Sequence, residues 1–356
     1  MRGLTNIIAL LSLTGLVSTV TAAPTEYQSL DFEQLNARAD SSLVGYLGTF
    51  FLGDEPSVYF YLSNGNNALS FRALNGGKPI LVPSGGTGGV RDPSLITGGG
   101  DESGSKWYII GTDLDIAKSK TTWDASQRNG SLSIYIWEST DLVNWSAERL
   151  VKVENDDAGM VWAPDAIWDP AENAYLVHWA SKFYAADDVD HSGPPTNIVI
   201  RYAYTIDFVS FSSPATLIDT GSSSIIDLNI LPLESGSTNS YARFIKNETA
   251  TNVYMEISTT GLNVGANDAW TRPGGPDAII RSGVEGPAAY LDNMEDGLAH
   301  LLLDYFSDDG YRPFENADPA TSDVWTDSDR SNFPSNLRHG SVLGVDQGRY
   351  DALNQL

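Results

Sequence analysis

The feature of this sequence that most constrains its fold is a recurring unit of short apolar strands, in which the first strand of each unit opens with a polar residue. These opening residues are Asp92, Asp165, Asp227, Glu285 and His339, and the intervals between them are 73, 62, 58 and 54 residues. Spacings of this size fit a propeller blade of four strands with loops of variable length. The repeat therefore predicts an all-β propeller.

The two ends of the repeat complement each other. Three strand-like segments (45–52, 58–62 and 69–73) precede the first complete unit, and one segment (338–343) follows the last. Together they supply the four strands of a fifth blade. We therefore expect a five-bladed β-propeller over residues 43–356, with its last blade closed by N- and C-terminal strands. A β-sandwich is the alternative, but it does not account for complementary ends.

Each complete unit is expected to end in an outer segment built on a turn and an aromatic residue. These outer segments are residues 141–145, 207–211 and 261–270, and in the fourth unit a less regular stretch that reaches Trp325. No long stretch keeps the 3.6-residue apolar period of an amphipathic helix, so we expect little helix.

Composition restricts the chemistry. The chain has 356 residues, of which 41% are hydrophobic, so it can build a large core. It has no Cys, which excludes thiol catalysis and thiolate metal sites. The net charge of −25 disfavours nucleic acid and anionic membranes as partners and is compatible with a neutral polysaccharide.

The N-terminus reads as a processing segment. Arg2 precedes a largely apolar stretch (7–20) that is too short to span a bilayer, and small residues around Ala22 fit a cleavage site. We expect a signal peptide over residues 1–23 and a mobile leader over 24–42. Three glycosylation sequons follow, at Asn129, Asn144 and Asn247. A secreted, extracellular glycoprotein is the expectation.

Three acids stand at apparent strand openings beside proline: Asp92, Asp165 and Glu285. The first strands of propeller blades line the central channel, so we expect the three side chains to share one pocket, at corresponding positions of the repeat. One acid can act as a base, one as an acid, and the third can raise the pKa of the acid. Cleavage of a glycosidic bond needs this division of labour. Singly, Asp92 is also compatible with a turn and Asp165 with a strand cap, whereas Glu285, followed by Gly286 and Pro287, is the least easily explained by a structural role.

The segments that carry these acids resemble the three signature segments of glycoside hydrolase family 43; they are Arg91-Asp92-Pro93-Ser94, Trp162-Ala163-Pro164-Asp165 and Glu285-Gly286-Pro287. The resemblance extends from about residue 43 to residue 343. It implies a five-bladed propeller and an inverting reaction, with Asp92 as general base, Asp165 as pKa modulator and Glu285 as general acid. Arg91 is a departure, because many members have another residue there. Arg-Asp-Pro also occurs in the related retaining invertases, but their upstream Asn-Asp-Pro segment is missing here.

Further candidates are expected around the same pocket. Trp162 is the candidate platform for stacking a sugar, with Phe183, Tyr184 and Tyr290 as lesser ones. Asp227 either binds substrate or caps its strand. The segment Arg338-His339-Gly340 resembles the family's last-blade segment, where His holds a water or a structural calcium. The alternative is that His339 is a satisfied core residue. No metal or other cofactor is expected to be required.

The resemblance implies an enzyme that acts on plant cell-wall polysaccharide, first of all by releasing arabinose from arabinan or arabinoxylan. Cleavage of β-1,3-galactan or of xylo-oligosaccharides is the alternative within the class. A non-catalytic carbohydrate-binding propeller and a protein-binding propeller are the alternatives outside it, and retention of all three acids disfavours both. We expect a monomer.

Overall fold

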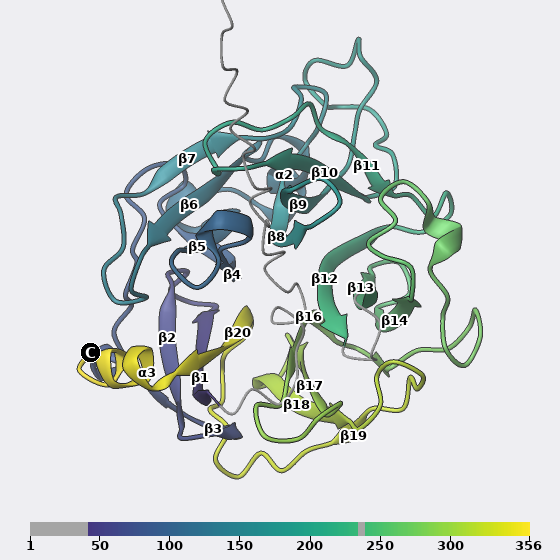
Figure 1. Cartoon of the computed structure of the whole chain (residues 1–356). Helices are drawn as coiled ribbons and strands as arrows, with labels where there is room; N and C mark the ends of the chain where they lie inside the picture. The colour runs from purple at the N-terminus through teal and green to yellow at the C-terminus, as the bar shows by residue number, and fades with distance from the viewer. Residues whose placement is uncertain (1–41, 234–238) are drawn as a thin grey trace, which may run out of the picture. The chain divides into compact units, whose positions relative to one another are not determined.

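The computed structural model describes residues 42–233 and 239–356. Within them, twenty strands form five four-stranded antiparallel sheets, arranged as the blades of a propeller (Figure 1). The predicted fold is therefore confirmed. The expected signal peptide (1–23) and, apart from its last residue, the expected leader (24–42) lie outside the described residues.

The blades follow one another along the chain. Blade 1 holds β4 (Val90–Thr97), β5 (Trp107–Asp113), β6 (Ser133–Ser139) and β7 (Arg149–Lys152). Blade 2 holds β8 (Trp162–Asp169), β9 (Ala174–Ser181), β10 (Val199–Thr205) and β11 (Ala215–Ile218). Blade 3 holds β12 (Ile225–Leu233), β13 (Ser240–Asn247), β14 (Asn252–Ser258) and β15 (Arg281–Ser282). Blade 4 holds β16 (Glu285–Leu291), β17 (Ala299–Tyr305), β18 (Gly310–Asn316) and β19 (Thr326–Asp327).

Blade 5 joins the two ends of the described chain, as predicted. Its inner strand is β20 (Arg338–Asp346), followed by β1 (Leu43–Phe51), β2 (Tyr59–Asn64) and β3 (Asn67–Ala73). The register aligns Leu47 with Leu343. The C-terminal helix α3 (Gln347–Leu353), which the sequence did not predict, adds a second connection. The Tyr350 hydroxyl on this helix donates to the Ser63 carbonyl at 2.8 Å.

The predicted outer segments are wrong in position. Residues 141–145 and 207–211 form turns, and the outer strands β7 and β11 begin after them. Each turn is fixed by an aspartate, since Asp141 and Asp207 each accept hydrogen bonds from the backbone N–H groups two and three residues further on. In blade 3, residues 261–270 are likewise not a strand, and they contain a short 3₁₀ helix, Asn267–Ala269.

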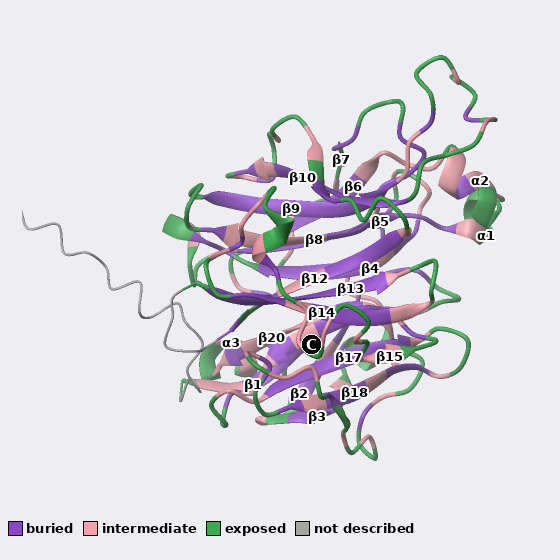
Figure 2. Ribbon diagram, turned by 90° about the vertical axis from the view of Figure 1, so that its right-hand side faces the viewer, coloured by how far each residue is buried: buried purple, intermediate pink, exposed green. Residues whose placement is uncertain are grey.

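Apolar side chains fill the space between neighbouring blades, and the buried parts of the strands contrast with the exposed loops in Figure 2. Between blades 1 and 2 the rings of Tyr108, Tyr175 and Phe208 pack together, with centroids 4.2 to 5.7 Å apart. Such aromatic clusters contribute large buried area together with preferred ring geometry. No helix in the described part of the chain is both long and apolar enough to cross a membrane.

Every inner strand carries a β-bulge at the same place. In β4 the pairing with β5 shifts between Arg91 and Ser94, so that two residues of β4 face one residue of β5. The same two-against-one shift occurs in β8, β12, β16 and β20. Bulges of this kind re-aim side chains next to functional sites. They also give the five strands a common frame, in which residues can be placed before the bulge, in it or after it.

Candidate active site

The first bulge residue of each inner strand forms one level of the central channel. In order of blades, these residues are Asp92, Ala163, Asp227, Gly286 and His339. Asp92 and Asp227 adopt the left-handed backbone conformation, with φ of +50° and +55°, which aspartate tolerates better than most residues. His339 lies between them. Its Nδ1 is 3.4 Å from Asp92 Oδ1 and 3.9 Å from Asp227 Oδ1.

Burial and charge set the protonation of these three groups. Burial raises the pKa of Asp227 to about 6; the charges of Glu285 and Asp92 add to this effect, while those of His339 and Lys246 oppose it. Burial would lower the pKa of His339, but the two carboxylates beside it raise that pKa to about 9. Burial also opposes ionisation of Asp92. There the hydrogen bond and charge of His339, with Arg91 and Thr112, prevail and lower the pKa.

Glu285 occupies the position directly before the bulge of β16. Its Oε2 accepts a hydrogen bond from Lys246 Nζ at 2.7 Å, and its Oε1 accepts one from Arg338 Nη2 at 3.2 Å. The next residue, Gly286, donates its backbone N–H to Asp227 Oδ2 at 3.0 Å. Glu285 is therefore tied to the level of Asp92 and Asp227 through its own neighbour in the chain.

Gly286 is needed at its position for a steric reason. Its φ is +54°, and a Cβ added there would lie only 2.7 Å from Cγ of His339. The absence of a side chain lets the imidazole of His339 pack against the backbone of β16. The Glu-Gly-Pro segment thus positions both the glutamate and the histidine.

Two charged residues of the site were not identified from the sequence. Lys246 of β13 pairs with Ile226 of β12, and the carboxylates of Glu285 and Asp227 raise its pKa against the effect of burial. Asp304, fully buried on β17, accepts a hydrogen bond from Arg338 Nε at 2.7 Å. A lone lysine in Phe244-Ile245-Lys246 and a lone aspartate after Leu301-Leu302-Leu303 were the available signals, because charges in such apolar strands are rarely without function.

Asp165 is placed differently from the other acids. It follows the bulge of β8, whereas Asp92 is in a bulge and Glu285 precedes one. The expectation that the three acids stand at corresponding positions is therefore wrong. The structural equivalent of Asp92 is Asp227, and the equivalent of Asp165 in blade 3 is Asn229.

The carboxylate of Asp165 is held by hydrogen bonds from three sides. Ser94 Oγ and the backbone N–H of Ala166 donate to Oδ1, and Asn229 Nδ2 donates to Oδ2 at 3.1 Å. A cavity of about 10 Å³, enough for about one water, is lined by both Asp92 and Asp165. Asp165 thus lies on the same cavity as Asp92, but its hydrogen bonds join the inner strands β4, β8 and β12.

The other candidates divide into two groups. Trp162 and Arg338 both occupy the position before the bulge, as Glu285 does, and so lie on the same level of the channel. The aromatic residues Tyr184 and Tyr290 are buried, with Tyr290 donating its hydroxyl to the Ala68 carbonyl. Phe183 lies under the guanidinium of another residue, Arg201. The structure therefore supports Trp162 as a sugar platform more than Phe183, Tyr184 or Tyr290.

His339 is the residue near which the sequence suggests a structural calcium. Within residues 42–233 and 239–356, no group of three or more His, Asp or Glu side chains is arranged to hold a metal ion. Calcium takes six to eight oxygen ligands, and the protonated imidazole of His339 itself supplies the positive charge between Asp92 and Asp227. The residues around His339 do not fit a calcium site.

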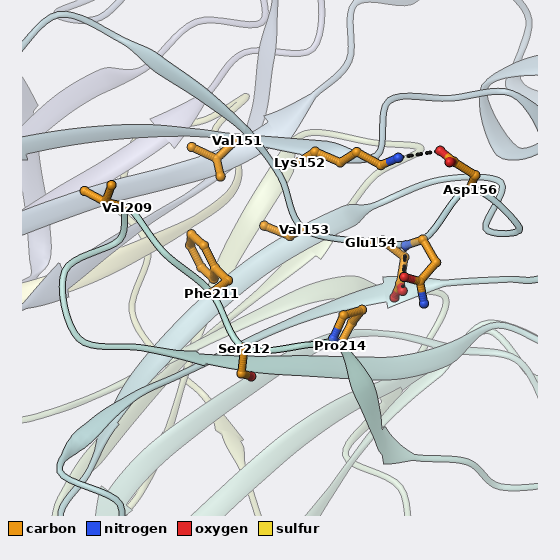
Figure 3. Close-up of a pocket in the computed structure, with 10 residues that line it drawn as sticks. Val151, Lys152, Val153, Glu154, Asp156, Val209, Phe211, Ser212 and Pro214 are labelled. Atoms are coloured by element: carbon orange, nitrogen blue, oxygen red, sulfur yellow. Dashed lines mark hydrogen bonds and ion pairs between the residues drawn. The ribbon is translucent and has the colours of Figure 1, made fainter.

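A larger hollow lies away from the acids, between the outer parts of blades 1 and 2 (Figure 3). Its volume is about 360 Å³, and its lining includes Val153 and Phe211. An ion pair between Lys152 and Asp156 borders it. None of the acids described above lines this hollow.

The sequence and the fold were compared with known proteins. A family model described as "Probable glycosyl hydrolase domain" matches residues 41–351. An α-L-arabinofuranosidase of Bifidobacterium longum is 34% identical over 194 residues, which is 51% of this chain and 17% of that protein. The chain thus spans about a sixth of that relative's length.

Among solved structures, the catalytic domain of a Coprinopsis cinerea GH62 α-L-arabinofuranosidase aligns with a TM-score of 0.47 and 14% identity, covering 74% of this chain and 77% of that one. The Podospora anserina α-L-arabinofuranosidase PaAbf62A, in complex with cellotriose, aligns with a TM-score of 0.45 and 13% identity, covering 70% and 71%. A putative exo-β-1,3-galactanase of Bifidobacterium bifidum aligns with a TM-score of 0.44 and 15% identity, covering 69% and 73%.

Proposed function

The chain belongs to the family of probable glycosyl hydrolases whose model it matches, and from this membership we propose that it hydrolyses O-glycosidic bonds of plant cell-wall polysaccharide. The proposed product is L-arabinose, released from arabinan or arabinoxylan. The arabinofuranosidase relative supports this choice of sugar. The observation that carries the proposal is that His339 lies between Asp92 and Asp227, and that Asp227 accepts a hydrogen bond from Gly286, the residue after Glu285.

The proposed reaction is an inverting hydrolysis. Glu285 protonates the glycosidic oxygen as the bond from that oxygen to the anomeric carbon breaks. Asp92 accepts a proton from a water, whose oxygen forms the new bond to the anomeric carbon from the opposite face. The lowered pKa of Asp92 favours its ionised form, as a base requires. The proton lost by Glu285 and the one gained by Asp92 balance over one turnover.

We assign the third acidic role to Asp227 instead of Asp165. Asp227 shares the bulge position of Asp92 and contacts the backbone next to Glu285. A buried carboxylate there affects the charge of its neighbours at short range, as a pKa modulator must. Asp165 instead has its carboxylate taken up by Ser94, Asn229 and its own strand. We propose that Asp165 positions the inner strands and takes no part in proton transfer.

The remaining groups of the site receive positioning or binding roles in this proposal. Lys246 and Arg338 fix the carboxylate of Glu285, and Asp304 fixes Arg338 in turn. Trp162, on the level of Glu285, is proposed to stack against the sugar. No metal takes part in the proposed steps.

Secretion also belongs to the proposal. It rests on the N-terminal sequence pattern and on the sequons, of which Asn129 and Asn144 are exposed in the fold and Asn247 is half-buried. Glycosylation of the two exposed asparagines would be sterically permitted. A shift in mass after treatment of the secreted protein with an endoglycosidase would test this assignment.

The proposed function is tested by sugar release from linear arabinan, arabinoxylan, β-1,3-galactan and xylo-oligosaccharides, beside the variant Glu285→Gln. We expect arabinose from one of the first two substrates, and loss of at least a hundred-fold in rate in the variant. Proton NMR of the first product should show the inverted anomer. Release of galactose or xylose alone would replace the proposed substrate, and release of no sugar from any of them would overturn the proposed function.

A further inference from the structure

Arg91 is a cation close to the acids Asp92 and Glu285. It precedes the bulge of β4, as Arg338 and Glu285 precede theirs, and so belongs to the same level of the channel. Arg338 and Glu285 form ion pairs, but among residues 42–233 and 239–356 no side-chain hydrogen bond or ion pair is made by Arg91. Five N–H donors in a rigid plane remain available.

Aromatic rings hold this guanidinium in place. Its Cζ lies 4.5 Å from the ring centroid of Phe51, which is buried, and 5.2 Å from that of Trp123. Contacts of this kind orient an arginine without using its hydrogen-bond donors. The plane of donors is therefore fixed before any ligand arrives.

Trp123 is exposed although it is the largest type of apolar side chain. It begins helix α2 (Trp123–Arg128), in the connection between β5 and β6, and 51% of its surface is accessible. Its ring meets the ring of Trp162 edge-on, at a centroid distance of 6.1 Å and an angle of 84°. The two indoles form a corner beside the level of Glu285. An exposed indole next to such a site offers a flat apolar face to a ligand.

The helix that carries Trp123 is fastened to the next blade. Arg128 Nη1 donates to the carbonyls of His191 and Gly193 at 3.0 and 3.1 Å, and Lys182 Nζ donates to Gln127 Oε1 at 2.5 Å. The backbone N–H of Gly130 donates to the Gly159 carbonyl at 2.8 Å. Because these contacts hold α2 in place, little conformational freedom would be lost when a ligand stacks on Trp123.

We propose that Arg91 and Trp123 form a second sugar-binding subsite. It binds a neutral sugar of the substrate, next to the sugar that hydrolysis releases. The apolar face of that ring stacks on Trp123, and two neighbouring hydroxyls accept hydrogen bonds from Arg91. A neutral ring is favoured over a uronate because Asp92 and Glu285 lie close enough to act on the charge of Arg91, and a bound carboxylate would be repelled by both. This inference rests on the proposed function.

The test compares a polymer with a substrate of one sugar. Arabinoxylan needs the second subsite, whereas methyl α-L-arabinofuranoside has no second ring to place there. For Trp123→Ala we expect KM for arabinoxylan to rise about ten-fold, with kcat/KM for the methyl glycoside much less affected. Trp123→Phe should restore most of the loss, because a phenyl ring still stacks. Arg91→Lys should also raise KM for arabinoxylan, since it keeps the charge but loses the planar donors.

The matched control is Leu150→Ala on β7, which removes a side chain that is 41% exposed on the outer strand of the same blade. It should change neither substrate's kinetics. The inference is overturned if Trp123→Ala lowers kcat/KM equally for both substrates, which would indicate a structural role, or if it changes neither.

Native electrophoresis in gels that contain arabinoxylan measures binding without turnover. A protein that binds the polymer is retarded, so the wild type is compared with Trp123→Ala. Wild-type retardation that the variant loses supports the subsite. Equal retardation of both proteins, or of neither, overturns it. If the wild type releases no sugar from these substrates or from arabinan, β-1,3-galactan and xylo-oligosaccharides, the proposed function fails, and the electrophoresis decides the subsite separately.

Discussion

Asp227→Asn should make the fold more stable while removing activity. The carboxylate of Asp227 is 7% exposed, and burial raises its pKa from an ordinary value of 3.8 to about 6. The folded protein therefore binds the proton more tightly than the unfolded chain does. Stability contributed by the protonated form is present at low pH and is lost as the pH rises from about 4 to about 6. An asparagine resembles the protonated acid at every pH.

The size of the effect follows from the change in pKa. A difference of this size corresponds to about 3 kcal/mol of unfolding free energy above pH 6. A domain of about 300 residues has an unfolding entropy near 0.65 kcal/mol per kelvin. We therefore expect the melting temperature of the variant to exceed that of the wild type by about 4–5 °C at pH 7. At pH 4 the difference should nearly vanish, because Asp227 is then largely protonated in the wild type.

Scanning calorimetry of both proteins at pH 4 and pH 7, at one scan rate, measures this difference. Equal melting temperatures at pH 7, or a less stable variant, would refute the assignment of Asp227 as a carboxylate buried at a cost to the fold.

Two further substitutions test other parts of the structure. The side chain of Glu154 is fully buried and forms an ion pair with Arg201 at 2.8 Å. Arg201→Met removes this partner and should lower the unfolding free energy by about 3–5 kcal/mol. An unchanged melting temperature would contradict this. Gly286→Ala places a Cβ 2.7 Å from His339 and should lower kcat/KM, whereas Gly283→Ala has the same backbone strain, at φ +72°, but open space and should keep its activity. Equal kinetics for the two glycine variants would contradict the steric role of Gly286.

The sequence was sufficient to predict the number of blades and the closure of the ring. The reason is that apolar strands recur at nearly even spacing, and the leftover strands at the two ends add up to one blade. The outer strands were less predictable. Turns such as 141–145 contain an aromatic residue and a pair of adjacent apolar residues, as a short strand can, whereas the true outer strand β7 has only four residues. Helix α3 was missed because the repeat was taken to end at residue 343.

The site was predicted in part. His339 lies beside Asp92 and packs against Gly286, the neighbour of Glu285, whereas the proline beside Asp165 aligns this acid with the others at the wrong position. The bulge, which the sequence does not show directly, places Asp165 two residues beyond the position of Asp92. A signal was nevertheless present. Asp227 and Asn229 are spaced as Asp92 and Ser94 are, whereas the blade 2 segment has Ala163 where the other two have aspartate.

The measurement that tests the central claim most directly compares Asp227→Asn with Asp165→Asn, for both kcat on arabinoxylan and melting temperature at pH 7. The account predicts opposite results. Asp227→Asn should lose at least a hundred-fold in kcat and melt at a higher temperature. Asp165→Asn should keep kcat within about ten-fold of the wild-type value but melt at a lower temperature. The reason is that its new amide faces the amide of Asn229, so a buried hydrogen bond is lost. A large loss of kcat in Asp165→Asn, with Asp227→Asn still active, would contradict the account.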